Sequence, residues 1–311
     1  MSLRHIVLAT AAVSAAMVAL PQAAQAHRAW LAPVATNFSG KDPWVTVDAA
    51  VSNDLFYADH QPMQLGAVTA VAPDGSKLPL ENATRGKYRS TFDVQIDKPG
   101  TYRISMLNDN VQASYKVGEE TKRVRGTMDS VRKEVPAGAK NLSVSRSQTR
   151  IDVFVTSGKP TDTVVKPTGS GLELVAYTHP NDLVAGEKAN FGLVIDGKPA
   201  AGVPVTVIPG GIRYRDQLGE IKAVTGKDGK FSVTWPEAGM YWMNASYPVR
   251  EEDDEDDAPA ARAPAAGANA GAARQGGPAA GGGGRQQPQG GTLDAPVLRS
   301  SYTATLEVLA P

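Results

Sequence analysis

Short runs of alternating apolar and polar residues, separated by turn residues, account for most of this sequence. The runs are rich in Val, Ile, Thr and Tyr and occupy residues 44–51, 66–71, 87–96, 101–106, 148–156, 171–175, 189–195, 203–208, 230–235, 240–247 and 299–308. Alternation with a period of two residues is typical of strands with one buried face. The turn signals between them include Asp74-Gly75, Pro99-Gly100, Asp196-Gly197 and Asp228-Gly229. Apart from one short helical turn at 127–134, no helix pattern occurs, so the sequence predicts an all-β fold.

The strand pattern divides into two units. Residues 27–157 form the first unit, and residues 171–311 form the second. Residues 158–170 are rich in Gly, Pro and Thr and show no periodicity, so we predict a linker there. Antiparallel strands at this spacing predict two Ig-like β-sandwich domains. The length of the chain agrees, because a typical domain has roughly 100–200 residues.

One segment interrupts the second unit. An unbroken acidic run at 251–257 is followed by Ala, Pro, Gly, Gln and Arg up to about residue 291. Such a composition buries too little apolar surface to offset the entropy of ordering, so we predict a disordered insertion over 250–296. The acidic run also lacks the ligand spacing of a calcium-binding loop. The strand predicted at 299–308 then completes the second domain.

The first 26 residues have the pattern of a secretory signal peptide. Arg4 precedes an apolar run at 6–20, and Ala24-Gln25-Ala26 is a small-residue cleavage site. No further apolar run is long enough to span a bilayer, and no cysteine is present for lipid attachment. We therefore expect cleavage after Ala26 and release of a soluble protein, which in a Gram-negative cell means a periplasmic one.

Composition argues against several classes of function. The 32 basic and 32 acidic residues balance, so nothing favours binding to nucleic acid or to an anionic membrane. The absence of cysteine excludes disulfides, thiolate metal sites and cysteine nucleophiles. No serine-nucleophile elbow, phosphate-binding glycine loop or H-E-x-x-H zinc motif occurs. We therefore predict that the protein is not an enzyme.

Cleavage after Ala26 would make His27 the first residue. Its α-amine and ring Nδ1 could then chelate one metal ion together, and His60 could complete a T-shaped set of three nitrogens. This histidine brace suits Cu(II), because copper favours tetragonal nitrogen coordination. The amine, with a pKa of about 8, must lose its proton to bind, which a divalent metal can drive near neutral pH. Trp30 and Leu31 would anchor the first strand and hold His27 in place.

Two further residues are candidate ligands. His179 is the third histidine that remains after cleavage, and Asp59 directly precedes His60. Either would adapt the brace to Ni(II), Co(II) or Zn(II). Each histidine also has an interpretation without metal. His27 can be a frayed terminal residue, His60 a solvated loop residue, and His179 a turn or interdomain residue.

The start of the processed chain resembles a known family. Residues 26–33, Ala-His-Arg-Ala-Trp-Leu-Ala-Pro, are similar to the A-H-x-x-W-L-x-P start of a periplasmic family of unknown function. Its members are often described as nickel-uptake-associated or cobalt-uptake-associated and often lie beside transporters. Further similarity covers residues 47–56, 171–174, 182–187, 197–202, 225–231 and 238–242. The resemblance implies a periplasmic two-unit β protein, with an Ig-like or transthyretin-like second unit, that is connected with transition-metal handling. The insertion departs from the family pattern.

One function is favoured and two alternatives stay open. We expect a periplasmic protein that holds a divalent copper, nickel or cobalt ion through His27 and His60. It would pass this ion to or from a transporter or receptor of the inner or outer membrane. The first alternative is an accessory protein that docks on such a membrane protein and binds no metal. The second is a copper-dependent oxidative enzyme, because a histidine brace can itself activate oxygen.

Overall fold

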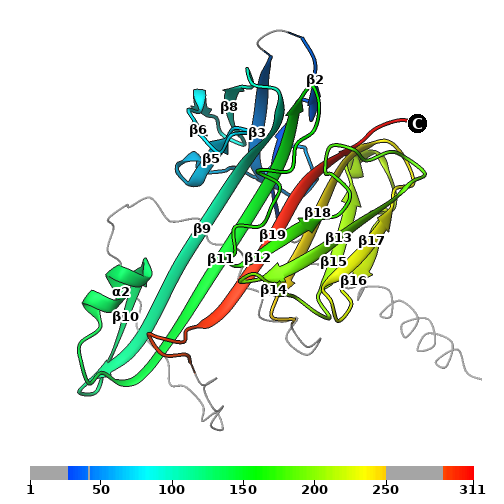
Figure 1. The fold of residues 1–311 in the computed structure, drawn as a ribbon. Helices are drawn as coiled ribbons and strands as arrows, with labels where there is room; N and C mark the ends of the chain where they lie inside the picture. Colours follow the sequence, from blue (N-terminus) through cyan, green and yellow to red (C-terminus); the bar gives the residue numbers. More distant parts are fainter. Residues whose placement is uncertain (1–26, 41–42, 250–289) are drawn as a thin grey trace, which may run out of the picture.

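The computed structural model describes residues 27–40, 43–249 and 290–311. The predicted signal peptide and residues 250–289 of the predicted insertion lie outside these ranges. Strands make up most of the described chain and form three sheets (Figure 1). Within the same ranges, no helix has both the length and the apolar character that crossing a membrane requires.

The first sheet has five strands in the order β1-β3-β8-β7, with β4 paired to β3. The strands are β1 (Arg28–Pro33), β3 (Trp44–Ser52), β4 (Gln61–Pro62), β7 (Glu81–Arg85) and β8 (Ser90–Gln95). In β3, Val45 and Val47 are fully buried, whereas Trp44 and Thr46 are exposed. The period of two residues therefore turns one face of β3 toward the core.

The second sheet has ten strands and runs through both units. Its main path is β16-β15-β18-β19-β11-β9-β5-β6, with β10 paired to β9 and β2 paired to β11. The strands are β2 (Asn37–Phe38), β5 (Val68–Val71), β6 (Lys77–Leu78), β9 (Gly100–Val117), β10 (Glu120–Gly126), β11 (Lys140–Ser157), β15 (Pro204–Pro209), β16 (Ile221–Val224), β18 (Gly239–Tyr247) and β19 (Val297–Val308). A short 3-10 turn, η1 (Leu65–Ala67), leads into β5. The last strand, β19, pairs in parallel with β11 and so joins the second unit to the first.

The third sheet consists of β12 (Leu172–Ala176), β13 (Lys188–Ile195), β14 (Lys198–Pro199) and β17 (Lys230–Thr234). The chain turns from β13 to β14 through Asp196 and Gly197, whose φ angles are 49° and 76°. Glycine adopts positive φ without strain, and aspartate tolerates it better than most residues. The turn therefore forms where the sequence predicted it.

Two apolar cores fill the space between the sheets. In the first unit, the five-stranded sheet packs on β5, β9 and β11, and Phe92, Tyr102 and Ile151 belong to this core. In the second unit, the third sheet packs on β15, β18 and β19 around Trp235 and Tyr241. The predicted fold class, all-β with two sandwiches, is confirmed. Strand pairing is antiparallel except where β19 and β2 pair with β11.

The antiparallel pair of β9 and β11 is longer than the sequence predicted. Both strands have 18 residues. They extend beyond the sandwiches as an arm, residues 107–147, which carries β10 and the helix α2 (Met128–Glu134) at its end (Figure 1). A small separate core around Val131 lies under the helix. Thr127 accepts a hydrogen bond from Ser130 N–H at 3.2 Å and caps α2, so the predicted helical turn is confirmed.

Two segments that the sequence placed outside the domains make defined contacts. Residues 158–170, the predicted linker, contain no strand, but Val164 and Val165 are buried. Residues 290–296, at the end of the predicted insertion, lie against the arm, where Val144 N–H donates to Gly291 O at 2.8 Å. The domain boundaries themselves stay predictions.

Four charged side chains are buried between the units. Arg103 Nη2 lies 2.5 Å from Asp152 Oδ2 and 3.6 Å from Glu173 Oε1, and Arg150 Nη2 lies 3.4 Å from Glu173 Oε1. Arg103 alternates in β9 with residues of the first core, so the cluster occupies the opposite face of the sheet. Two positive and two negative charges balance there. The cluster fixes β12 of the second unit on the long strands of the first.

Candidate functional site

His27 and His60 lie on either side of the same end of β3. Arg28 pairs with Ser52, the last residue of β3, so His27 stands just beyond this pair. On the other side of β3, His60 directly precedes β4, which pairs with the end of β3. Neighbouring strands are about 4.8 Å apart, so the two backbones are separated by roughly 10 Å. Two imidazole side chains that lean toward each other can span such a gap.

The two imidazole rings are in direct contact. Their centroids are 3.8 Å apart, and their planes differ by 9°. Both residues are exposed to solvent. The structure therefore brings together the two histidines that the sequence analysis paired, and their binding of a metal stays a prediction.

Hydrogen bonds fix the loop between β3 and β4. Trp30 Nε1 donates to Ser52 Oγ at 2.7 Å, and Ser52 Oγ donates to Asp54 O at 2.6 Å. Asn53 N–H donates to Asp59 Oδ1 at 2.9 Å. Trp30 and Ser52 are fully buried, so water does not compete for the bond between them. The loop presents His60 from a fixed backbone.

Asp59, a predicted ligand, lies in the loop between β3 and β4. Its Oδ1 accepts a hydrogen bond from Asn53 N–H. In residues 27–40, 43–249 and 290–311, no three His, Asp or Glu side chains are grouped closely enough to hold a metal. The described side chains thus offer two imidazoles, and a third strong ligand has to come from elsewhere.

The spacing of the rings suits shared coordination after a small rotation. Nitrogens that bind one ion at about 2.0–2.1 Å lie at most about 4.2 Å apart. A centroid separation of 3.8 Å is compatible with this limit. In nearly parallel rings, however, the lone pairs lie in two nearly parallel planes, with ring centroids 3.8 Å apart, so one ring must tilt before both can reach one ion. Solvent exposure of both side chains permits that tilt.

The loop also packs against the second unit. A buried cluster spans the two units and consists of Trp30, Ala50, Leu55, Ile208 and Trp242. Trp242 Nε1 donates to Ala29 O at 3.0 Å, so β18 holds the strand that begins at the candidate site. Sequence reasoning missed Trp242, because an aromatic residue in a buried strand is ordinary. No local signal shows that its indole faces another unit.

Arg28, which follows His27 in the sequence, carries a positive charge between the loop and the second unit. Its Nη1 donates to Asn53 O at 3.0 Å, and its guanidinium lies 6.0 Å from the centre of the Trp242 ring. Burial lowers the pKa of Arg28, while the carboxylates of Glu220 and Asp54 act in the opposite direction. The carboxylates of Glu220 and Asp54 partly balance the charge of Arg28, so they reduce the repulsion between Arg28 and a bound metal ion.

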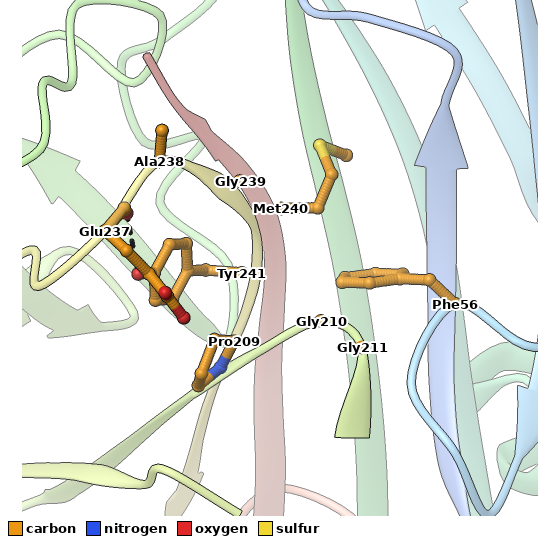
Figure 2. Close-up of a pocket in the computed structure, with 9 residues that line it drawn as sticks. All are labelled: Phe56, Pro209, Gly210, Gly211, Glu237, Ala238, Gly239, Met240 and Tyr241. Carbon is orange, nitrogen blue, oxygen red and sulfur yellow. Dashed lines mark hydrogen bonds between the residues drawn. The ribbon is translucent and has the colours of Figure 1, made fainter. Parts of the chain in front are cut away.

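A cavity of about 340 Å³ lies next to the loop (Figure 2). It lies between Phe56 and the second unit, near the 3-10 turn η2 (Ile212–Tyr214). Its lining consists of Phe56, Pro209, Gly210, Gly211, Glu237, Ala238, Gly239, Met240 and Tyr241. The Phe56 ring lies close to Gly210, where an added Cβ would come within 2.9 Å of it. The lining contains no histidine and one carboxylate, so the cavity is not part of the paired-histidine site.

His179 lies away from the paired histidines. Its Nδ1 accepts a hydrogen bond from Asn181 N–H at 3.1 Å, and its Nε2 lies 3.1 Å from Thr101 Oγ1. Thr101 in turn bonds Thr156, which is in the β11 segment that pairs with β2. The ring is thus near the chain that follows the far end of β1. The structure does not bring His179 to His27, and both of its ring nitrogens have protein partners.

The half-buried position of His179 predicts a pH effect on stability. Burial lowers its pKa below the usual 6.5, and Nδ1 must stay unprotonated to accept from Asn181 N–H. The unfolded chain then binds the proton more readily than the folded chain. The stabilisation should therefore be complete above about pH 6.5 and decline as the pH falls toward the lower pKa of the folded state. Urea unfolding of the wild type and His179→Gln at pH 7.5 and 5.5 should show a smaller decline in the variant.

Comparisons with known proteins point to one family. No curated protein matches the chain in sequence. Among solved structures, the D0-D1 domain of intimin has 14% identity and a TM-score of 0.18, covering 69% of this chain and 88% of its own. A DUF4785 family protein from Legionella pneumophila has 9% identity and a TM-score of 0.19, covering 70% and 51%. A pullulanase from Anoxybacillus has 12% identity and a TM-score of 0.15, covering 71% and 24%.

These structural likenesses are too weak to support a conclusion. The sequence match to a family model is different in kind, because it extends over residues 24–249 and so includes both histidines of the pair. The model is that of a domain of unknown function, DUF4198. The chain therefore belongs to the DUF4198 family.

Proposed function

We propose that the protein, once cleaved after Ala26, is a periplasmic carrier of a divalent copper, nickel or cobalt ion. The ion would be held by His27 and His60 and passed to or from a membrane transporter or receptor. The contact between the two rings, 3.8 Å from centroid to centroid, carries this proposal. The chain has no cysteine, so it offers no thiolate ligand. Imidazoles are then its strongest side-chain ligands for copper, nickel or cobalt.

The α-amine of His27 is the proposed third ligand. It exists only after the preceding peptide bond is cut, and it chelates together with Nδ1 of the same residue. Three nitrogens around one ion approach the tetragonal arrangement that Cu(II) prefers. A carboxylate such as Asp59 or a water molecule would complete the coordination for nickel or cobalt. The site would then become competent only in the processed protein.

Exposure of the pair favours a carrier over a storage protein. Both histidines face solvent, so a bound ion could be reached by ligands of a partner protein. Exchange of ligands at an exposed ion is the step that transfer to a transporter requires. The resemblance of the chain to proteins associated with nickel or cobalt uptake supports the same class of cargo and partner.

Replacement of His60 tests the proposal. In the processed protein, His60→Ala should weaken Cu(II) binding by about tenfold or more, since one of three nitrogen ligands is lost. His179→Gln is the matched control, because it removes a histidine that lies away from the pair. It should change affinity by less than about twofold. Calorimetric titration of both variants beside the wild type gives the comparison.

Two results would contradict the carrier. Equal affinity of His60→Ala and wild type would show that His60 is not a ligand. Absence of binding in every form would favour the accessory protein without metal. Oxygen consumption by the copper-loaded wild type with a reductant would instead favour the oxidative enzyme, which uses the same ligands.

A further inference from the structure

One face of the arm is open to solvent and, except for Val297, polar. It is formed by alternate residues of four neighbouring strands: Asn108–Lys116 in β9, Thr121–Arg125 in β10, Ser143–Ser147 in β11 and Val297–Arg299 in β19. The strand registers pair Gln112 with Arg125 and with Ser145, and Ser147 with Arg299, so these residues share one face. The small core under α2 lies on the opposite face. We call this surface the arm face.

The arm face carries cations without carboxylates. Lys116, Arg123, Arg125 and Arg299 lie on it and are all exposed. Every other residue of the face is Ser, Thr, Asn or Gln except Val297. Within the part of the chain that the structure describes, none of the four cations forms an ion pair. The balanced charge of the whole chain therefore conceals a local excess of positive charge.

The other side chains of the arm face narrow the class of partner. It has no aromatic residue on which nucleic-acid bases could stack and almost no apolar surface to enter a lipid layer. An added peptide strand would pair at a sheet edge rather than on a face. Rows of hydroxyl and amide groups instead match the hydroxyl groups of sugars. The strand geometry gives an area of roughly 27 Å by 14 Å, which suits an extended polymer.

We propose that the arm face binds an anionic polysaccharide that lies along β9. Guanidinium and ammonium groups would pair with carboxylates of the polymer, and the Ser, Thr, Asn and Gln side chains would bond its hydroxyl groups. The arm projects from both sandwiches (Figure 1). The proposal is independent of the paired histidines, which lie outside the arm.

Two double variants of equal charge test the proposal. Arg123→Gln with Arg125→Gln removes two cations from the arm face. Lys122→Gln with Lys133→Gln removes two from the other side of the arm, since Lys122 pairs with Tyr115 of the small core and Lys133 is in α2. An oligogalacturonate is the probe, titrated at low salt into the full-length processed protein. We expect the first variant to lose about tenfold in affinity and the second less than about twofold, with wild-type binding weakened by salt.

Several outcomes would overturn the proposal. Equal losses of oligogalacturonate affinity in the two variants would show that the polymer is attracted by overall charge alone. Binding of neutral dextran as tight as that of oligogalacturonate would show that the cations of the arm face play no role. Tighter binding of single-stranded DNA or of anionic phospholipid vesicles would assign the face to another partner. If oligogalacturonate binds only after residues 251–257 are changed to Gln and Asn, the face is taken by the chain's own acidic run. Thermal unfolding of both variants shows that they are folded when compared.

Discussion

Replacement of Glu173 by glutamine is expected to lower the free energy of unfolding by about 3–5 kcal/mol. Glu173 is fully buried and lies within 3.6 Å of both Arg103 and Arg150. Without its charge, the cluster would hold two guanidinium groups against the single carboxylate of Asp152. An uncompensated charge in a buried site is costly, because little water is available to solvate it.

The hydrogen bonds of Glu173 make the loss larger. Its Oε1 accepts from Thr168 N–H and Thr168 Oγ1, and its Oε2 accepts from the N–H groups of Gly169 and Ser170. A glutamine side chain has only one acceptor oxygen. Its NH2 group would therefore point at N–H or O–H groups that are themselves donors and could not bond to it. The predicted linker would then lose part of its attachment to β12, and both units would be affected together.

Urea unfolding at pH 7 measures this loss. The matched control is Asp294→Asn, an equally conservative change in the exposed ion pair with Arg132, and it should alter stability by less than about 1 kcal/mol. A change below about 1 kcal/mol in Glu173→Gln as well would show that the cluster does not hold the units together.

Much of the fold could be predicted from local patterns. Alternation in β3 and β8, and the turn at Asp196-Gly197, each depend on neighbouring residues, so the sequence reveals them. The full length of β9 could not be read in this way. Residues 108–110, Asn-Asp-Asn, resemble a turn signal, yet they pair with β11 without a break. The continuous backbone hydrogen bonding to β11 outweighs the low strand propensity of Asn and Asp.

Long-range pairing is the part that the sequence conceals. β19 pairs with β11 across a separation of about 150 residues, and no local feature of residues 297–308 specifies a parallel partner in the other unit. The buried charges were missed for a related reason. Arg150 and Asp152 alternate with Ile151 and Val153, which is the pattern of a strand with one solvated face. Only the position of β12 shows that this face is covered.

The candidate site was predictable in its residues and not in its geometry. His27 and His60 stand out because few histidines remain in a chain without cysteine. Their contact depends on β4, a strand of two residues that pairs with the end of β3. A pairing so short leaves almost no trace in the sequence. The position of His179 likewise depends on the hydrogen bonds that it makes with Thr101 and Asn181.

Acetylation of the His27 α-amine in the processed protein should have the largest effect on metal binding. The nitrogen of His27 is then an amide, whose lone pair is delocalised into the carbonyl group, and no free terminal amine takes its place. The six-membered chelate ring that the amine and Nδ1 form with the metal is then lost, and the described chain offers only two imidazoles. We expect Cu(II) affinity to fall by about 100-fold or more. This loss is larger than the loss caused by removing a residue that only hydrogen-bonds to a ligand. The difference should narrow below pH 7, where protons compete for the free amine.

The Cu(II) dissociation constants of the two forms, measured side by side at pH 7.5, test the metal site most directly. Both forms begin at His27, and in the second form the α-amine is acetylated. A site built on the α-amine, His27 and His60 predicts that the form with the free amine binds about 100-fold more tightly. Equal dissociation constants in the two forms would contradict that site.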